Sequence, residues 1–451
     1  MEDEQYKRMT ETPVERLICQ LALPTITSML VTAIYNSADA YFVGKLGKSA
    51  SGAVGVVFSL MTIIQAVGFT VGMGAGSNIS RLLGARKNDE ANVIASSAFC
   101  IAVVFGLLLT VICLPLSGRL MLLLGATDTI LPYAVSYARY ILLAAPLMTA
   151  SFVMNNVLRS EGHATFSMIG ISTGGILNMI LDPIFIFRFN MGIAGAAAAT
   201  AVSQCVSFLI LLSSFVSKRS TIRLSVKNIS FKLSVYARII KNGLPSFTRQ
   251  GLASIATVML NKNAGICGGD AAISAMTIVG KVFMMIFSSC LGFGQGYQPV
   301  VGYNYGAKRH DRVRRAFFFA LKVGTVILTC FAVAMFIFAE EVVSAFIKDG
   351  EVIGIGIRAL RAQCLSMPVL TLGVICNMTF QTIGKSWTAT FLSSARQGIF
   401  FLPAIVVLPM ILGLDGMIIT QPVADIMTFL CCIPFAVSFI HKLPRENCRI
   451  L

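Results

Sequence analysis

Apolar runs separated by short polar stretches fill almost the whole chain. A run of about 20 apolar residues is long enough to cross the ~30 Å hydrocarbon core of a bilayer as a helix. We therefore predict an all-α polytopic membrane protein with twelve transmembrane helices. These runs lie near residues 17–43, 53–79, 93–115, 133–158, 166–187, 193–217, 244–266, 273–302, 315–339, 355–380, 388–412 and 416–440.

The composition agrees with this pattern and excludes a soluble protein. Of the 451 residues, 56% are hydrophobic and 12% are charged, whereas a soluble domain carries roughly 25% charged residues. The net charge of +16 does not indicate nucleic-acid binding, because the basic residues lie in short connections between apolar runs. In such connections they orient a membrane protein.

The basic residues gather on one side of the predicted membrane. That side holds both termini, the linker 218–241 and the even-numbered connections, and basic residues favour the cytoplasmic side. We therefore predict that both termini are cytoplasmic. The opposite connections hold only Lys45, Lys48, Arg119, Arg188, Lys262 and Lys348.

The two halves of the chain repeat at an offset of about 221–222 residues. Six spans in each half give both copies the same membrane orientation, as in parallel-repeat transporters. We predict an N-lobe over 1–217, a cytoplasmic linker over 218–241 and a C-lobe over 242–451, the lobes being related by a pseudo-two-fold axis. The matching pairs include Leu23/Leu244, Pro24/Pro245, Arg139/Arg361, Pro146/Pro368, Asn155/Asn377, Gly162/Gly384, Gly192/Gly413 and Gly195/Gly416.

Two acids lie within spans of the first half, where a charge is costly and needs a reason. Asp39 shares a helical face with Tyr35 and Asn36, and Asp182 shares one with Asn178. Their hard oxygens suit Na⁺, and a buried carboxylate pair also suits a proton relay. A plainer interpretation is that both acids lie near span ends and face water. Thr200 and Asn155 add polar groups to the same half.

The second half does not repeat these acids. The counterpart of Asp39 is Leu260 or Asn261, that of Asp182 is Leu402 or Pro403, and Thr200 aligns with Gln421. Acids that served only the shared fold should occur in both copies. We therefore interpret Asp39 and Asp182 as site residues of the N-lobe.

The second half carries its own charges within spans, namely Lys281, Arg396 and Asp425. At 1.5 Å rise per residue, Arg396 and Asp425 each lie roughly 12–15 Å into their spans and are able to pair. The pair would be either a structural ion pair or part of a C-lobe cleft. Lys281 would either join it or extend its amine to the membrane surface.

Several motifs resemble the multidrug and toxic compound extrusion (MATE) transporters, and in style their bacterial DinF/MepA-like branch. They are Leu23-Pro24, the stretch 36–44 that contains Asp39, Gly84-Ala85, the segment 155–162, Asn178 with Asp182-Pro183, and Gly192 with Thr200. The resemblance covers essentially the whole chain.

The resemblance implies two six-helix lobes and a secondary antiporter of the bacterial inner membrane. Such an antiporter would export amphipathic or cationic drugs in exchange for Na⁺ or H⁺. The resemblance also places the cation site at Asp39, Asn178, Asp182 and Thr200, with Asn155 and Tyr35 nearby. We expect a monomer in contact with membrane lipid, with no cofactor beyond the coupling ion and no nucleic-acid partner.

Two other functions are open at this point. A flippase for lipid-linked oligosaccharides or other lipid precursors would show a cationic cleft, for which Arg139, Arg361 and Arg396 are available. A membrane-embedded enzyme would need a reactive constellation. The three histidines, His163, His310 and His441, fall in predicted loops or the tail, which disfavours an enzyme.

Overall fold

The computed structural model describes residues 2–217 and 219–444, and all regular structure in these ranges is helical. Residue 218 of the predicted linker and residues 445–451 of the predicted C-lobe lie outside the described ranges. Ten helical segments are long and apolar enough to cross a membrane. Two of them, Leu233–Gly306 and Ser386–Lys442, each turn back at glycine and hold two spans. The predicted twelve spans are thereby confirmed.

The first half begins with a short polar helix, α1 (Glu2–Glu11), which the sequence did not predict. The first transmembrane group follows in chain order, with a second short helix, α5, between α4 and α6. A π-helical turn, η1, continues α7. The elements are α2 (Val14–Gly44), α3 (Lys48–Gly84), α4 (Asn88–Cys113), α5 (Ser117–Leu123), α6 (Leu131–Ser160), α7 (Ala164–Pro183), η1 (Ile184–Arg188) and α8 (Ile193–Val216).

The second half follows a connection that contains the 3₁₀ turn η2 (Val226–Asn228). The first residues of α9 fall inside the range that we assigned to the linker. The elements are α9 (Leu233–Gly306), α10 (His310–Ile337), α11 (Ala339–Ser344), α12 (Gly350–Thr382), α13 (Ser386–Ser394), the π-helical turn η3 (Ala395–Phe400) and α14 (Phe401–Lys442).

The internal repeat is visible in the backbone. Gly192 and Gly413 adopt nearly the same conformation, with φ/ψ of 56°/−134° and 58°/−131°. Arg86 and Lys308, which the repeat also pairs, are two of only three non-glycine residues with positive φ in the described chain. Because such angles are rare outside glycine, their recurrence at equivalent positions reflects a duplicated fold.

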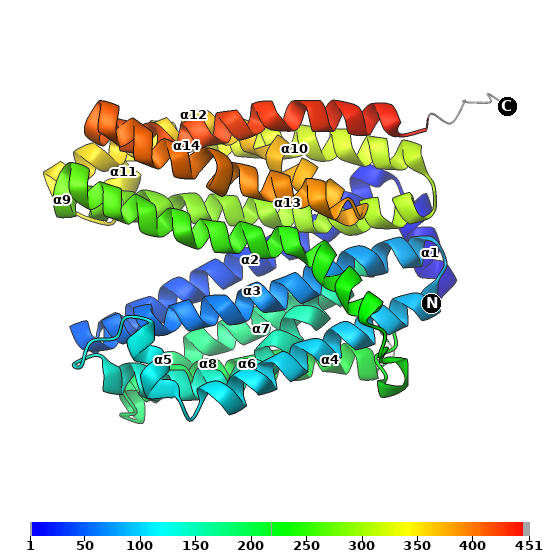
Figure 1. Ribbon diagram of the computed structural model, residues 1–451, viewed down its shortest axis with the longest axis horizontal. Coiled ribbons are helices and arrows are strands. Elements are labelled where there is room, and N and C mark those ends of the chain that lie inside the picture. The colour runs from blue at the N-terminus through cyan, green and yellow to red at the C-terminus, as the bar shows by residue number, and fades with distance from the viewer. Residues whose placement is uncertain (1, 218, 445–451) are drawn as a thin grey trace.

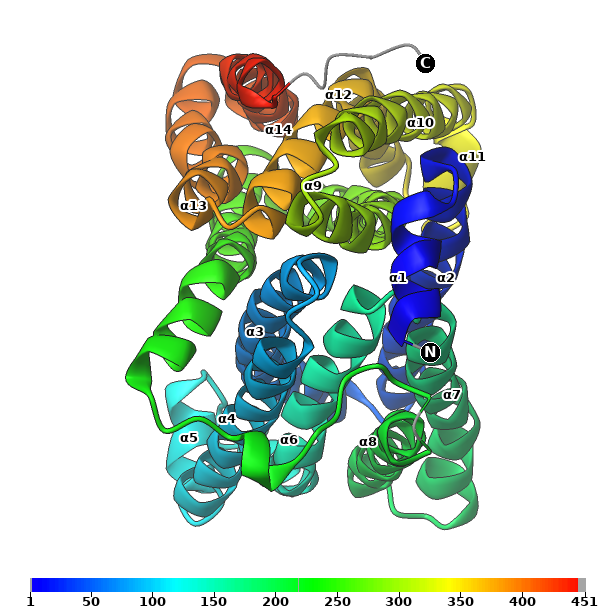
Figure 2. The same ribbon diagram turned by 90° about the vertical axis from the view of Figure 1, so that its right-hand side faces the viewer.

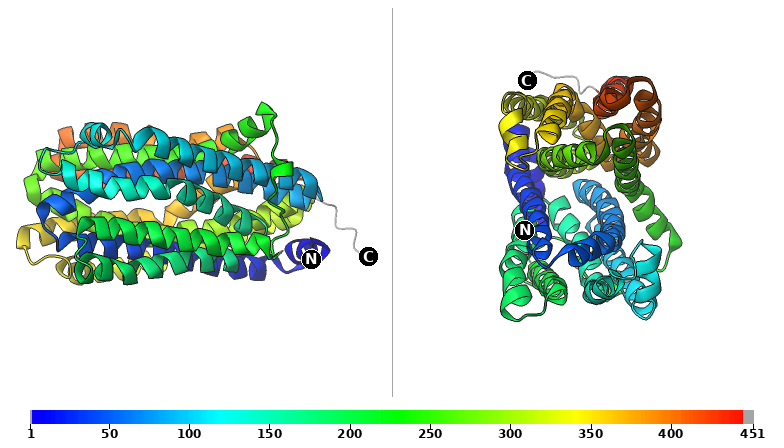
Figure 3. Two further views of the ribbon diagram at one scale, coloured as in Figure 1. Left: turned by 90° about the horizontal axis from the view of Figure 1, so that it is seen from below. Right: turned by 90° about the vertical axis from the view of Figure 1, so that its left-hand side faces the viewer.

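The long helices run side by side along the longest dimension of the molecule (Figure 1). The end-on view separates α9, α10, α12, α13 and α14 from α3, α4, α6, α7 and α8 (Figure 2). The view from the opposite end shows the same two bundles, and the view from below shows their long helices side by side (Figure 3). The two-lobe fold class is thereby confirmed, and α1 and the last turns of α14 lie at the same end (Figure 1).

The lobes are joined at the end that carries the termini. Thr25 donates to the carbonyl of Gly292 at 2.6 Å, and Arg159 donates to Gln295 at 2.6 Å. The short helix α1 reaches both lobes, since Gln5 donates to the Glu161 carbonyl and Asn304 donates to that of Met9. Within the described ranges, all side-chain hydrogen bonds between the lobes lie in this half of the molecule. The lobes are therefore closed against each other at this end.

Candidate cation-coupling site

The close packing of α2 against α7 brings the two acids to one place. Gly175 lies so near Tyr35 that a Cβ added there would be 2.9 Å from the tyrosine ring. The two helices run in the same direction, because each begins at the end that carries the termini. One turn beyond this contact, α2 presents Asp39 and α7 presents Asn178 and then Asp182.

The amide of Asn178 links α7 to α8. Its Nδ2 donates to Asp182 Oδ1 at 3.2 Å and to Thr200 Oγ1 at 3.3 Å. Thr200 in turn donates to the Ala196 carbonyl at 3.1 Å. Asn178, Asp182 and Thr200 are all buried. The structure therefore assembles three of the four residues of the predicted cation site into one hydrogen-bonded group.

Tyr137 of α6 contacts the fourth residue, Asp39, and sequence reasoning missed this tyrosine. The hydroxyl of this fully buried tyrosine donates to Asp39 Oδ2 at 3.4 Å. A buried tyrosine hydroxyl needs a hydrogen-bond partner, and an apolar helix offers few. That need is the one signal in the sequence that could have singled out Tyr137.

Three acceptor oxygens of this group have no hydrogen-bond partner among the residues that the structure describes. They are Asp39 Oδ1, Asn178 Oδ1 and Asp182 Oδ2, and all three atoms are buried. A buried acceptor without a partner costs roughly 1–3 kcal/mol, and native structures contain few of them. Oxygens of two carboxylates and one amide are suited to receive a proton or a small hard cation.

The other predicted support residues lie differently. Asn155 donates to the Ser167 carbonyl at 3.4 Å as well as to Ser167 Oγ at 2.7 Å, and its repeat partner Asn377 donates to the equivalent Ala389 carbonyl at 2.7 Å. A contact that recurs in both lobes serves the shared fold. Asn36 is half-buried and makes no side-chain hydrogen bond with a described residue.

The structure pairs Arg396 with Asp425. Arg396 Nε lies 2.7 Å from Asp425 Oδ1, and 0% of the aspartate side chain is exposed. This pairing confirms that the two residues meet across their helices. Lys281 is exposed and forms no ion pair with any described residue, so it stands apart from them.

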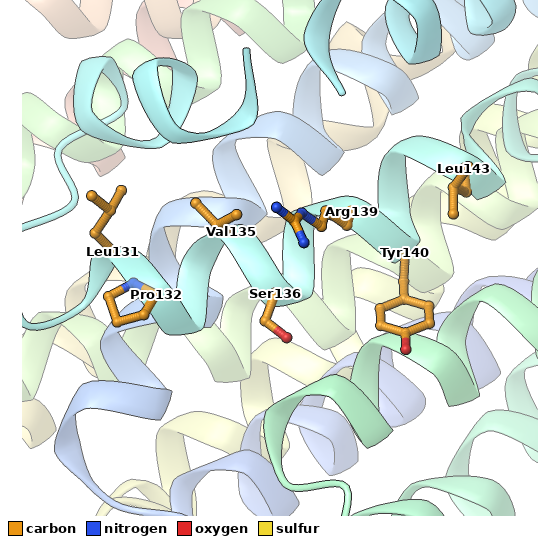
Figure 4. Close-up of a pocket in the computed structure, with 7 residues that line it drawn as sticks. All are labelled: Leu131, Pro132, Val135, Ser136, Arg139, Tyr140 and Leu143. Atoms are coloured by element: carbon orange, nitrogen blue, oxygen red, sulfur yellow. The ribbon is translucent and has the colours of Figure 1, made fainter. Parts of the chain in front are cut away.

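The arginines available for a cationic cleft are dispersed. Arg139 lies on the side of α6 that lines an open hollow with Pro132, Ser136 and Tyr140 (Figure 4). It follows Tyr137 by two residues and therefore points roughly 200° around the helix from the acids. Arg361 donates instead to the Phe336 carbonyl at 3.3 Å.

Comparisons with known proteins agree with the fold and the repeat. The family model MatE matches residues 24–184 and 245–406, two ranges at the same offset as the repeat. The first range contains Asp39, Asn178 and Asp182.

Individual relatives cover the whole chain. The multidrug export protein MepA of Staphylococcus aureus is 26% identical over 455 residues and 100% of both chains. MepA of Staphylococcus haemolyticus is 26% identical over 100% of this chain and 99% of that protein. An outward-facing multidrug resistance MATE family transporter of the MOP superfamily superimposes with a TM-score of 0.92. It is 27% identical and covers 97% of this chain and 98% of its own.

Proposed function

This chain belongs to the MatE family, and from that premise we propose that it exports amphipathic organic cations and drugs in exchange for Na⁺ or H⁺. The family fixes a multi-pass membrane transporter. The relatives named multidrug export proteins support the drug substrates.

The observation that carries the coupling is the set of oxygens on Asp39, Asn178 and Asp182 that accept no hydrogen bond from a described residue. Without a proton or cation, two negative carboxylates would lie close together with oxygens that accept no hydrogen bond. Burying such charges at low dielectric is costly. Cation binding satisfies these oxygens and draws α2, α7 and α8 together. A cation thereby favours one arrangement of these helices over another, which is what coupling requires.

The way in which the lobes meet supports alternating access. If the termini are cytoplasmic, as the basic residues predict, the contacts of Thr25 and Arg159 close the cytoplasmic end. This arrangement faces outward, like the outward-facing relative. Export then requires these contacts to break so that a drug enters from the cytoplasm.

The test is ethidium export in proteoliposomes under a sodium gradient or a pH gradient imposed separately. We expect one gradient to drive export by the wild type, and Asp39→Asn or Asp182→Asn to abolish that response. Asp128→Asn is the matched control, because Asp128 is an exposed acid between α5 and α6. Full gradient-driven export by both site variants would refute the coupling role.

The flippase has less support. A flippase needs several positive charges gathered in one cleft, whereas Arg396 is a single arginine paired with Asp425 and Arg139 points away from the acids. Accumulation of a lipid-linked precursor on deletion of the gene, with unchanged drug sensitivity, would favour the flippase. The family consists of transporters, which removes the enzyme alternative.

A further inference from the structure

A second polar cluster lies inside the C-lobe, and one of its members pairs in the repeat with a residue of the cation site. It consists of Arg396, Asp425, Gln421, Gln363 and Ser366, and we call it the C-lobe cluster. Gln421 is the repeat partner of Thr200. We propose that the C-lobe cluster, through Arg396, is a subsite for the carboxylate of an aromatic substrate. This inference rests on the proposed export function and names one class of compound that the exporter takes.

The carboxylate of Asp425 is fully occupied by the protein. Oδ1 accepts from Arg396 Nε at 2.7 Å and from Gln421 Nε2 at 2.8 Å. Oδ2 accepts from Gln363 Nε2 at 3.0 Å and from Ser366 Oγ at 3.1 Å. With two donors on each oxygen, Asp425 is held in place and has no room for a cationic group of a drug.

Arg396, in contrast, uses only one of its three nitrogens. Nε binds Asp425, whereas Nη1 and Nη2 donate to no residue that the structure describes. Nη2 is moreover buried, so water does not satisfy it freely. The guanidinium therefore keeps its Nη1–Nη2 edge for another acceptor, and this edge matches a carboxylate through two parallel hydrogen bonds.

Two phenylalanines of α9 hold the guanidinium in position. The centre of the guanidinium lies 5.2 Å from the Phe283 ring and 4.7 Å from the Phe287 ring. The two rings stack at 5.6 Å with 16° between their planes. They restrict the arginine by cation–π contact and offer an apolar surface to an aromatic ligand.

The cluster is approachable from the arginine side. The Arg396 side chain is 15% exposed, whereas that of Asp425 is 0% exposed. Phe283 and Phe287 are half-buried on the same side. A ligand thus meets the Arg396 side chain and the two rings before it meets Asp425, which stays behind them as a fixed anchor.

The charges distinguish this subsite from the N-lobe. The N-lobe acids attract cations, but the guanidinium edge repels a cationic group and attracts an anionic one. The two lobes then bind different parts or different classes of substrate. A drug that carries a carboxylate is expected to depend on Arg396, and its ester is not.

The test compares rhodamine B, which carries a free carboxylate, with rhodamine B ethyl ester, which lacks it. Binding of each dye to the purified full-length protein is measured by fluorescence anisotropy in lipid nanodiscs. The informative variant is Arg396→Gln with Asp425→Asn, because the double change leaves no unpaired buried charge. We expect it to raise the ratio of the two dissociation constants, acid over ester, by at least about tenfold.

Two further variants keep the inference falsifiable if the double variant folds poorly. Arg396→Lys keeps the positive charge but loses the planar pair of Nη donors, so the ratio of the two dissociation constants should rise by a smaller factor. Asp425→Asn alone leaves the arginine charge uncompensated, so the ratio should fall. If Arg396 and Asp425 form only a structural ion pair, each variant should weaken the binding of both dyes by the same factor. Ratios of the two dissociation constants equal to that of the wild type would therefore overturn the subsite. Ester export under the imposed gradients tests the exporter function separately, because loss of that export would not move the binding ratio.

Discussion

The contact between α3 and α9 at the closed end depends on glycine, and Gly243→Ala should open it. A Cβ on Gly243 would lie 1.9 Å from the Thr70 carbonyl oxygen. The reciprocal contact is equally close, since a Cβ on Gly74 would lie 2.0 Å from the carbonyl oxygen of Ile239. Neither neighbour is a flexible side chain, so the two helices themselves must move apart.

The size of the effect follows from the geometry. Carbon and carbonyl oxygen approach to about 3.3 Å at closest, so the backbones must separate by more than ~1 Å. Overpacking of this kind costs typically about 1–3 kcal/mol. That cost falls on the closed arrangement, because the contact is made there. The open population at this end should therefore rise about 5- to 150-fold.

Hydrogen–deuterium exchange of the purified protein measures this opening directly. Peptides that cover 70–84 of α3 and 236–246 of α9 should exchange faster in Gly243→Ala, by the factor given above. Gly251→Ala is the matched control, because it lies on the same helix and a Cβ there meets nothing within 4 Å. Equal exchange in the two variants would refute the role of this glycine contact.

Three further predictions follow from individual contacts. Tyr137→Phe removes the donor to Asp39, so the cation concentration for half-maximal export should change by about two- to tenfold; an unchanged value would exclude Tyr137 from the site. Burial raises the pKa of the Glu161 carboxyl, which lies just beyond the end of α6, from 4.5 to about 7. The folded protein therefore holds this proton more tightly than the unfolded chain, and the thermal midpoint should fall as the pH rises from about 4.5 to about 7. Glu161→Gln should lack this component, as melting curves across that range would reveal. Asn155→Ala removes the contact with Ser167, so the free energy of unfolding should fall by about 1 kcal/mol and the thermal midpoint should fall with it. The ion dependence of export should stay as in the wild type.

The transmembrane helices were predictable because the bilayer imposes a length and a composition on each of them. Even the turn at Gly268 and Gly269, which separates the two spans of α9, fell between two predicted spans. The helix α1 was not predictable. A helix of only ten residues, most of them polar, is not stable alone, and contacts such as that of Gln5 with the Glu161 carbonyl hold it in place.

Asp39 and Asp182 could be singled out from the sequence because a charge within a span is costly. Their partners could not, because partners depend on how helices rotate against one another. Tyr137 reads as one more apolar residue of α6 until packing turns it toward Asp39. Arg159 directly follows the predicted span 133–158 and so falls in a predicted cytoplasmic connection, yet the structure buries it at the interface of the lobes against Gln295. Both differences arise from tertiary packing, to which a hydropathy pattern is blind.

On the mechanism proposed above, Asp39 and Asp182 bind the cation that drives export. The most direct measurement is the cation flux that a dye gradient drives across a liposome membrane that holds the purified protein. For the wild type we predict a counter-flux of H⁺ or Na⁺ that starts and stops with dye movement. In Asp182→Asn the dye should drive no cation movement. If Asp39→Asn and Asp182→Asn both moved as many cations per dye molecule as the wild type, neither acid would be needed for coupling, contrary to the proposal.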